Sequence, residues 1–138
     1  MFMISQKEYT DYTIPKLLEY FPQFIEHCVI QPNDVVNIEY LSKNKKLELW
    51  ITTQDKEITI GLSGKEQLND WHTHMSLFGA NTPDEELREA AILLTAIITD
   101  EKVITYSSVS GYFLGRREDI EKYRQPGEVI RSYYWSEL

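Results

Sequence analysis

The stretch that decides the fold is residues 82–99, TPDEELREAAILLTAIIT. It opens with Thr82 as an N-cap, Pro83 at the first helical position and Glu85 three residues after the cap, a pattern that predicts a capping box. Apolar side chains then recur at helical spacing, at Leu87, Ala90, Ala91, Leu94, Ile97 and Ile98. Because Ile92 and Leu93 are apolar as well, we expect a long helix that is largely buried.

Three strand-like runs precede this helix, at residues 35–41, 46–52 and 57–62. In each run alternate residues are apolar, which predicts strands with one buried face and one solvated face. The breaks between the runs are short, so neighbouring runs should form hairpins of an antiparallel meander. A fourth, shorter strand is expected at residues 70–75.

The remaining elements complete the expected order. Thr13-Ile14-Pro15 predicts a helix start near the N-terminus. Beyond the long helix we expect a hairpin over residues 103–115, a short helix at 118–124 and a closing strand at 128–135. Strands in runs, with helices set apart, predict an α+β fold in a single domain of residues 1–138. We expect one mostly antiparallel sheet with the long helix buried on one face.

The amino-acid composition limits which kinds of partner and which cellular compartment we expect. The net charge is −8, from 14 basic and 22 acidic residues, which argues against nucleic acid and anionic membranes and suits a basic protein surface. The single cysteine, Cys28, excludes an intrachain disulfide and a cysteine zinc cluster. The first residues do not form a signal peptide, and no run approaches the ~20 apolar residues of a membrane span. These features predict a cytoplasmic protein.

Two of the three histidines, His72 and His74, lie two residues apart just before the long helix. On an extended strand such residues project from the same face, together with Asp70. The pair could be half of a metal site, a polar patch for a partner, or part of a strand edge without a special role. Two imidazoles and Asp70 could ligate one zinc ion.

The spacing is similar to that of JAMM-type metallopeptidases, in which His-x-His-Pro is followed by Ser-x-x-Asp. Met75, Thr82 and Glu85 stand where that family has Pro, Ser and the metal-binding Asp, and the expected capping box already accounts for the last two. A catalytic glutamate is also required, for which the strands offer equivalent candidates: Glu39, Glu48 and Glu57. We therefore expect no metal and no other cofactor. A metal-dependent hydrolase that uses His72 and His74 is kept as the alternative function.

The closing strand carries a second group of candidates, in which Arg131, Tyr133 and Trp135 alternate with the residues between them. Arginine together with aromatic residues is typical of interface hot spots. The same residue types are also typical of ordinary sheet packing.

From His72 onward these features follow one another in a particular order: a strand ending in His72-Thr73-His74-Met75, a long apolar helix, a hairpin and a strand with Arg131-Ser132-Tyr133-Tyr134-Trp135. In this order the last half of the chain resembles small bacterial α+β proteins, many of which are immunity proteins of polymorphic toxin systems. The chain departs from that group at Met75-Ser76, where Phe-Asp is usual, and in its ending, Trp135-Ser136-Glu137.

The resemblance implies a non-enzymatic protein that binds and neutralises a cognate toxin. Many such toxins are basic nucleases, so we expect a basic toxin domain as the partner. The residues expected to contribute to binding are His72, His74, Arg131, Tyr133 and Trp135.

Overall fold

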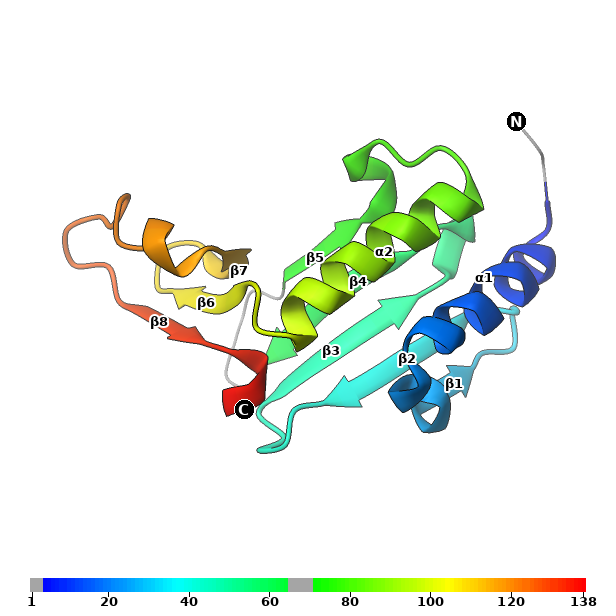
Figure 1. Cartoon of the computed structure of the whole chain (residues 1–138), viewed down its shortest axis with the longest axis horizontal. Coiled ribbons are helices and arrows are strands. Elements are labelled where there is room, and N and C mark those ends of the chain that lie inside the picture. The colour runs from blue at the N-terminus through cyan, green and yellow to red at the C-terminus, as the bar shows by residue number, and fades with distance from the viewer. Residues whose placement is uncertain (1–3, 65–70) are drawn as a thin grey trace.

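A computed structural model describes residues 4–64 and 71–138 of the chain. In chain order, its elements are α1 (Gln6–Tyr20), η1 (Pro22–His27), β1 (Cys28–Ile30), β2 (Val36–Leu41), β3 (Leu47–Thr52), η2 (Gln54–Lys56), β4 (Thr59–Gly64), β5 (Trp71–His74), η3 (Met75–Phe78), α2 (Pro83–Ile98), β6 (Val103–Ser107), β7 (Gly111–Gly115), η4 (Arg117–Asp119), β8 (Ile130–Tyr133) and η5 (Trp135–Glu137), where η marks a 3₁₀ helix (Figure 1). The predicted α+β fold is confirmed.

Strands β2 to β5 form the predicted antiparallel meander, and β1 is added at its edge. They are hydrogen-bonded in chain order from β1 to β5, and the register places Ile38 opposite Ile51 and Ile51 opposite Ile60. These three side chains are buried, as the alternation of apolar residues predicted. Strand β1 was not predicted, because its three residues are too few to show an alternating pattern.

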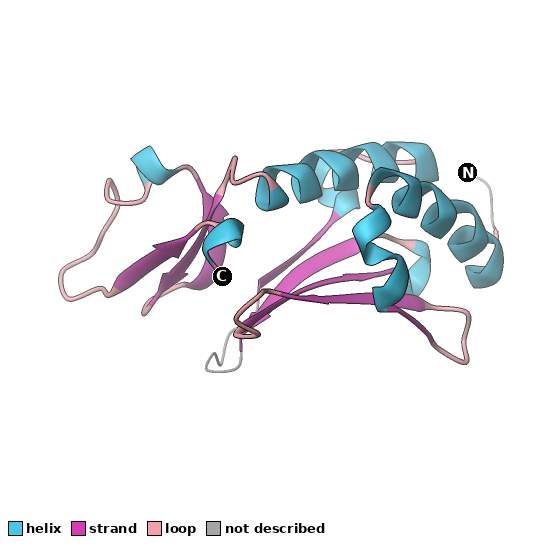
Figure 2. Ribbon diagram, turned by 60° about the horizontal axis from the view of Figure 1, so that its bottom comes forward, coloured by secondary structure: helices cyan, strands magenta, loops and turns pink. Residues whose placement is uncertain are grey.

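Helices α1 and α2 cover one face of this sheet, which we call the inner face (Figure 2). A single buried cluster fills the space between helices and sheet, with contributions from α1, α2 and strands β2 to β4. On α2 the buried side chains include Leu87, Ala90, Leu94 and Ile97, which confirms this part of the predicted stripe as core. Ala91 and Ile98 are partly buried, and Ile92, which was expected to be buried, is exposed because it faces away from the sheet. The opposite face of the sheet, which α1 and α2 do not cover, is turned toward solvent.

The start of α2 differs from the prediction by one hydrogen bond. The Thr82 hydroxyl accepts from the backbone N–H of Glu85 at 3.2 Å, as an N-cap should. The Glu85 carboxylate, however, accepts from the N–H of Asn81 at 2.7 Å and not from that of Thr82. The predicted capping box is therefore only half formed, because Glu85 reaches one residue further back along the chain.

Helix α1 begins earlier than expected, at Gln6 and not near Thr13. Its complete capping box is made by Ser5 and Glu8, which have the same spacing in the sequence as Thr82 and Glu85. The Thr13 hydroxyl donates to the carbonyl of Tyr9 at 2.8 Å inside the helix. Pro15 is exposed within the helix, where water can satisfy the backbone carbonyl that its missing N–H leaves without a partner.

The last three strands form a separate antiparallel sheet in the order β7-β6-β8, so the strands divide into two sheets and not the single sheet expected. Strand β6 is hydrogen-bonded on one side to β7 and on the other to β8. Contacts between side chains connect this sheet with the five-stranded sheet. Ile104 belongs to the main core. The Tyr112 ring fills the space beside Gly64, where an added Cβ would lie 2.6 Å from the phenolic oxygen.

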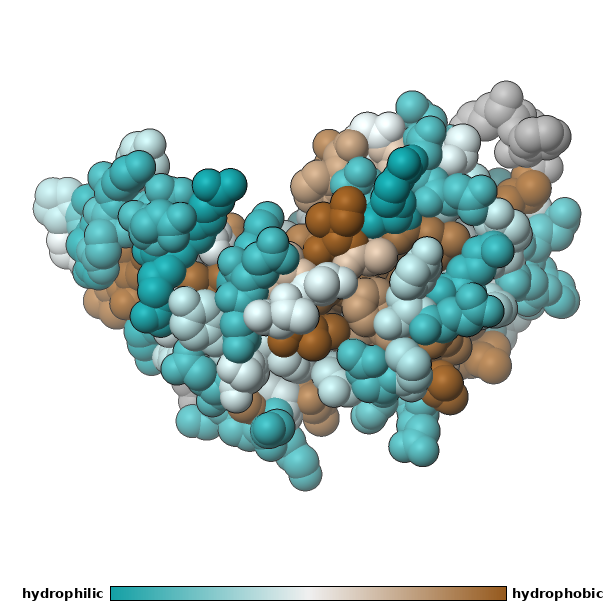
Figure 3. All heavy atoms as spheres, viewed as in Figure 1, coloured by the Kyte–Doolittle hydropathy of each residue, from teal (hydrophilic) through white to brown (hydrophobic). Residues whose placement is uncertain are grey.

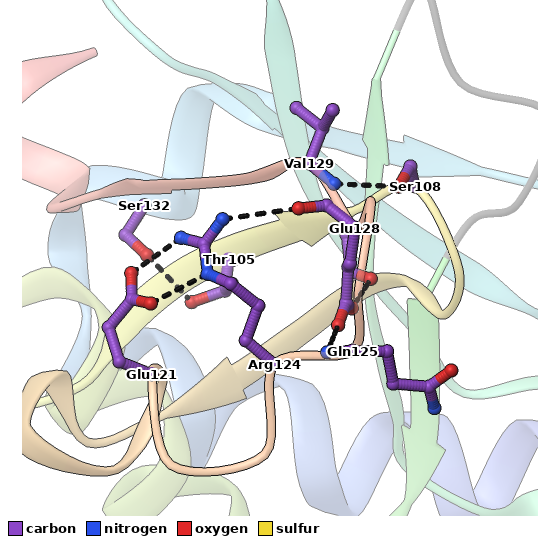
Figure 4. A network of polar contacts seen from close by, with 9 residues as sticks. Thr105, Ser108, Glu121, Arg124, Gln125, Glu128, Val129 and Ser132 are labelled. Atoms are coloured by element: carbon purple, nitrogen blue, oxygen red, sulfur yellow. Dashed lines mark hydrogen bonds and ion pairs between the residues drawn. The ribbon is translucent and has the colours of Figure 1, made fainter.

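A network of polar contacts holds the segment between β7 and β8 (Figure 4). The Arg124 guanidinium donates two hydrogen bonds of 2.6 Å to the Glu121 carboxylate and one of 3.1 Å to the carbonyl of Glu128. The Glu128 carboxylate accepts from the N–H of Gln125 at 2.9 Å and from the hydroxyl of Ser107. The short helix predicted at 118–124 is reduced to η4 and turns, because these contacts hold the chain in a tight loop.

The surface on the side of the helices carries both apolar and hydrophilic side chains. Figure 3 shows apolar residues gathered over and beside α2, with hydrophilic residues between them, and a hollow between this part and the three-stranded sheet. Exposed apolar side chains here include Leu77, Phe78 and Ile92. In the part of the chain that the structure describes, no helix is both long enough and apolar enough to cross a membrane.

Candidate functional site

The candidate site is the face of the five-stranded sheet turned away from α1 and α2, which we call the outer face. The strand register arranges its side chains in three rows. The first row is Val29, Asn37, Thr52, Thr59 and His74; the second is Glu39, Trp50, Gly61 and His72; the third is Leu41, Glu48 and Ser63. Apart from Val29, Trp50, Gly61 and Leu41, these residues are polar or charged.

His72 and His74 project together from the outer face, as predicted, while Trp71 packs against the core. Their ring centroids are 5.4 Å apart in an edge-to-face arrangement. The Nδ1 atom of His74 lies 2.8 Å from the Thr59 hydroxyl and 3.7 Å from a carboxylate oxygen of Glu57. The two imidazoles therefore lie among polar side chains of β4, β5 and the loop before β4.

The described residues do not complete the metal site that the sequence suggested around His72 and His74. Glu85 stands at the start of α2, on the inner side of the sheet, and its carboxylate is bound to the N–H of Asn81. Asp70, which could have been a third ligand or could have oriented the two histidines, lies outside the described residues. Within residues 4–64 and 71–138, no group of three or more His, Cys, Asp or Glu side chains is arranged to hold a metal ion.

Trp50 lies at the centre of the outer face. Its indole covers Gly61 on the neighbouring strand, so closely that a Cβ atom added at Gly61 would lie 2.1 Å from the indole Cζ2 atom. The indole N–H donates to the Ser63 hydroxyl at 2.9 Å, and the His72 ring centroid lies 6.2 Å away. A glycine within a strand here permits the close approach of a large aromatic ring. The ring is thereby fixed against the sheet and partly exposed.

Carboxylates surround this indole. Glu39 is the cross-strand partner of Trp50, and Glu48 precedes Trp50 by two residues on the same face. Burial raises the pKa of the Glu48 carboxyl, and the nearby charge of Glu39 raises it further. Two acidic groups held this close repel each other, so a cation between them would be stabilised.

Two shallow grooves of about 310 and 300 Å³ lie on either side of Trp50. Glu39 and Glu48 line the first groove, and Asp55 and Glu57 line the second together with the two histidines. The side chains of the described residues lining both grooves include four carboxylates and no lysine or arginine. The outer face is therefore acidic around a central aromatic ring, which favours a cationic partner.

The other three predicted binding residues lie elsewhere. Arg131 is in β8 with its guanidinium 5.0 Å from the Tyr106 ring centroid, and Tyr133 is paired in register with Ile104. Trp135 lies beyond the end of β8, in η5, where it stacks on Tyr40 with a centroid separation of 5.9 Å.

The structure corrects the expectation that Trp135 extends a strand stripe. Tyr40 points to the inner face, because it is paired with Leu49 in the core. The predicted binding residues are thus divided between the outer face and the three-stranded sheet. The residues that complete the outer face, Trp50, Glu39 and Glu48 above all, were not identified as binding candidates. The alternation along 35–41 and 46–52 already assigned them to the solvated face.

Comparisons with protein-family models, curated protein sequences and solved structures found no match for this chain. The resemblance to immunity proteins therefore remains a prediction from the residues after His72.

Proposed function

We propose that this chain is a non-enzymatic protein-binding module that holds a basic partner protein on its outer face. The observation that carries the proposal is the acidic surface around Trp50. Four carboxylates line the two grooves beside the Trp50 indole, which packs on Gly61. The described residues that line these grooves include no lysine or arginine. A rigid aromatic ring with complementary charge around it is a typical centre for a protein interface.

Within this proposal, the finer function is neutralisation of a cognate bacterial toxin in the cytoplasm. The net charge of −8 and the order of features after His72 support it. A basic toxin domain, such as a nuclease, would meet this surface faster and more selectively than a neutral one. The same charge disfavours nucleic acid and anionic membranes as partners.

The proposal is tested by co-expressing the chain with toxin domains encoded beside its gene. We expect the chain to restore growth of cells that express the toxin and to co-purify with it. If no neighbouring gene encodes a toxin, or if the neighbour kills equally well with and without this chain, toxin neutralisation is wrong. A neighbouring basic protein that binds without being toxic would leave protein binding standing and remove only the finer function.

A metal-dependent hydrolase that uses His72 and His74 remains the second candidate, supported by the adjacency of the two imidazoles to each other and of His74 to Glu57. Elemental analysis of protein purified without chelator separates the two functions. We expect substoichiometric zinc that is equal in the wild type and in His74→Ala. Stoichiometric zinc that disappears in His74→Ala would favour the hydrolase over the binding module.

A further inference from the structure

The indole of Trp50 is held as a platform with only one ring face available. Gly61 lies directly beneath it, and the Ser63 hydroxyl fixes the indole N–H at 2.9 Å. The His72 ring stands beside it, with centroids 6.2 Å apart and ring planes inclined by 32°. An aromatic face that is already immobilised loses little conformational entropy when a partner stacks on it.

Two carboxylates neighbour Trp50 on the outer face: Glu39 on β2, on the side away from His72, and Glu48 on β3 itself. The register places Glu39 directly across from Trp50, and Glu48 lies diagonally to Glu39 on the same face. Among the described residues, no lysine or arginine nitrogen lies within 4.0 Å of either carboxylate. Within the described residues, the two carboxylates therefore lie near each other without a basic side chain to neutralise them. Both line the same groove as Trp50.

We propose that Trp50, Glu39 and Glu48 form an anchor site for one arginine side chain of the basic partner. This inference rests on the proposed protein-binding function and names the chemistry that the partner must present. A guanidinium is planar and weakly hydrated, so it can stack on the exposed indole face while its N–H groups reach carboxylates at the edge. An ammonium is a compact, strongly hydrated charge and makes a poorer match to a flat ring.

The platform also explains why both acidic residues belong to one site. A stacked guanidinium directs its N–H groups outward in the plane of the ring, and both Glu39 and Glu48 line the same groove as the indole. Each carboxylate can then accept a charge-assisted hydrogen bond. The repulsion between Glu39 and Glu48 is relieved at the same time.

The test uses the full chain, labelled with ¹⁵N, and short peptides as probes. One peptide contains a single arginine, a second contains citrulline at that position, and a third contains lysine. Citrulline has nearly the same shape as arginine but no charge. The indole N–H signal of Trp50 is identified by its absence in Trp50→Phe, so that binding at the platform is observed directly.

We expect the arginine peptide to shift the Trp50 signal saturably, and the citrulline peptide to bind at least about tenfold more weakly because the charge is lost. The lysine peptide should bind between the two. The double variant Glu39→Gln/Glu48→Gln should weaken arginine binding by about tenfold, the combined effect of two partly exposed ion pairs. The matched control Glu19→Gln/Glu26→Gln removes two exposed carboxylates from α1 and η1 and should change binding by less than about twofold.

Three results would overturn the anchor site: no shift of the Trp50 signal, equal shifts from arginine and citrulline, or unchanged binding in Glu39→Gln/Glu48→Gln. Circular dichroism of each variant checks that the sheet is intact, and the glutamine variants keep the size of the replaced side chains. Failure of this inference differs from failure of the proposed function. A natural partner that binds Glu39→Gln/Glu48→Gln as tightly as wild type removes the anchor only. Arginine binding at Trp50, without any basic protein partner among the neighbouring genes, removes the function only.

Discussion

At the scale of single residues, Glu86 carries the most consequential buried contact. Its side chain is 8% exposed and accepts hydrogen bonds from the Tyr9 hydroxyl at 2.9 Å and from the N–H of Ile58 at 3.0 Å. One carboxylate thus connects α2 with α1 and with the residue before β4. Burial raises the pKa of Glu86, although both hydrogen bonds act in the opposite direction.

The stability of the protein should therefore depend on the ionisation of Glu86. A folded-state pKa above the unfolded value means that the folded protein binds this proton more tightly, so the free energy of unfolding decreases as the pH rises from about 4 through the raised pKa. In Glu86→Gln this part of the pH dependence should disappear. Glu86→Ala should lose about 2–5 kcal/mol, because two buried donors lose their acceptor. Urea unfolding at several pH values measures both effects, and an equal pH slope in wild type and Glu86→Gln would contradict the assignment.

Gly61 should be required for the position of Trp50. In Gly61→Ala the new Cβ would lie 2.1 Å from the indole, so the ring must move away and lose its hydrogen bond to Ser63. We expect a loss of about 1 kcal/mol of unfolding free energy and a large shift of the indole N–H signal. Ser63→Ala is the matched control, since it removes the hydrogen bond and leaves the ring over Gly61. An unmoved indole signal in Gly61→Ala would show that the ring does not cover this glycine.

The sequence predicts only part of what single residues do in the core and in the candidate site. The alternation along the strands correctly separated outer residues such as His72 and Trp50 from the core. It could not show that Trp50 lies flat on Gly61, because cross-strand pairing depends on hairpin register. Glu86 follows Asp84 and Glu85 in the first turn of α2, where all three acids suit the helix dipole. Only the packing of α1 distinguishes the one that is buried.

At the scale of elements, α2 is the helix on which the core depends. Leu94 is fully buried, whereas Ile92 on the same helix is 59% exposed. Leu94→Ala should reduce the unfolding free energy by about 2–5 kcal/mol, since it removes buried methyl groups and leaves a cavity. Ile92→Ala is the control and should change it by less than about 0.5 kcal/mol. Chemical denaturation measures both variants, and a loss for Leu94→Ala as small as that of the control would place this side of α2 outside the core.

Elements with a strong local pattern were predicted well, and elements defined by distant contacts were not. Helix α2 and strands β2 to β4 have caps or alternation of their own. Strand β1 exists because β2 offers it a partner, and the division into two sheets depends on β8 returning to β6. Trp135 lies beyond the strand, where its ring stacks on Tyr40 and packs against the core. None of these contacts has a signature in the local sequence.

At the scale of the whole molecule, the net charge is distributed unevenly along the chain. Residues 1–100 contain 8 basic and 16 acidic residues, whereas residues 101–138 contain 6 of each. The entire excess of negative charge therefore belongs to the part that forms the five-stranded sheet and its two helices. A basic partner should approach this part first, and the acidic grooves of the outer face then determine its orientation.

Association with a basic partner should accordingly be fast and sensitive to salt. Raising the ionic strength should lower the association rate more than it raises the dissociation rate, because long-range steering acts before contact. Glu39→Gln/Glu48→Gln should lower the association rate and flatten its salt dependence. The matched pair Glu101→Gln/Glu118→Gln removes two exposed charges from the neutral C-terminal part and should have a smaller effect. Stopped-flow kinetics with the partner identified by co-expression measures all of these rates, and equal salt slopes for the two double variants would mean that the outer face does not guide the encounter.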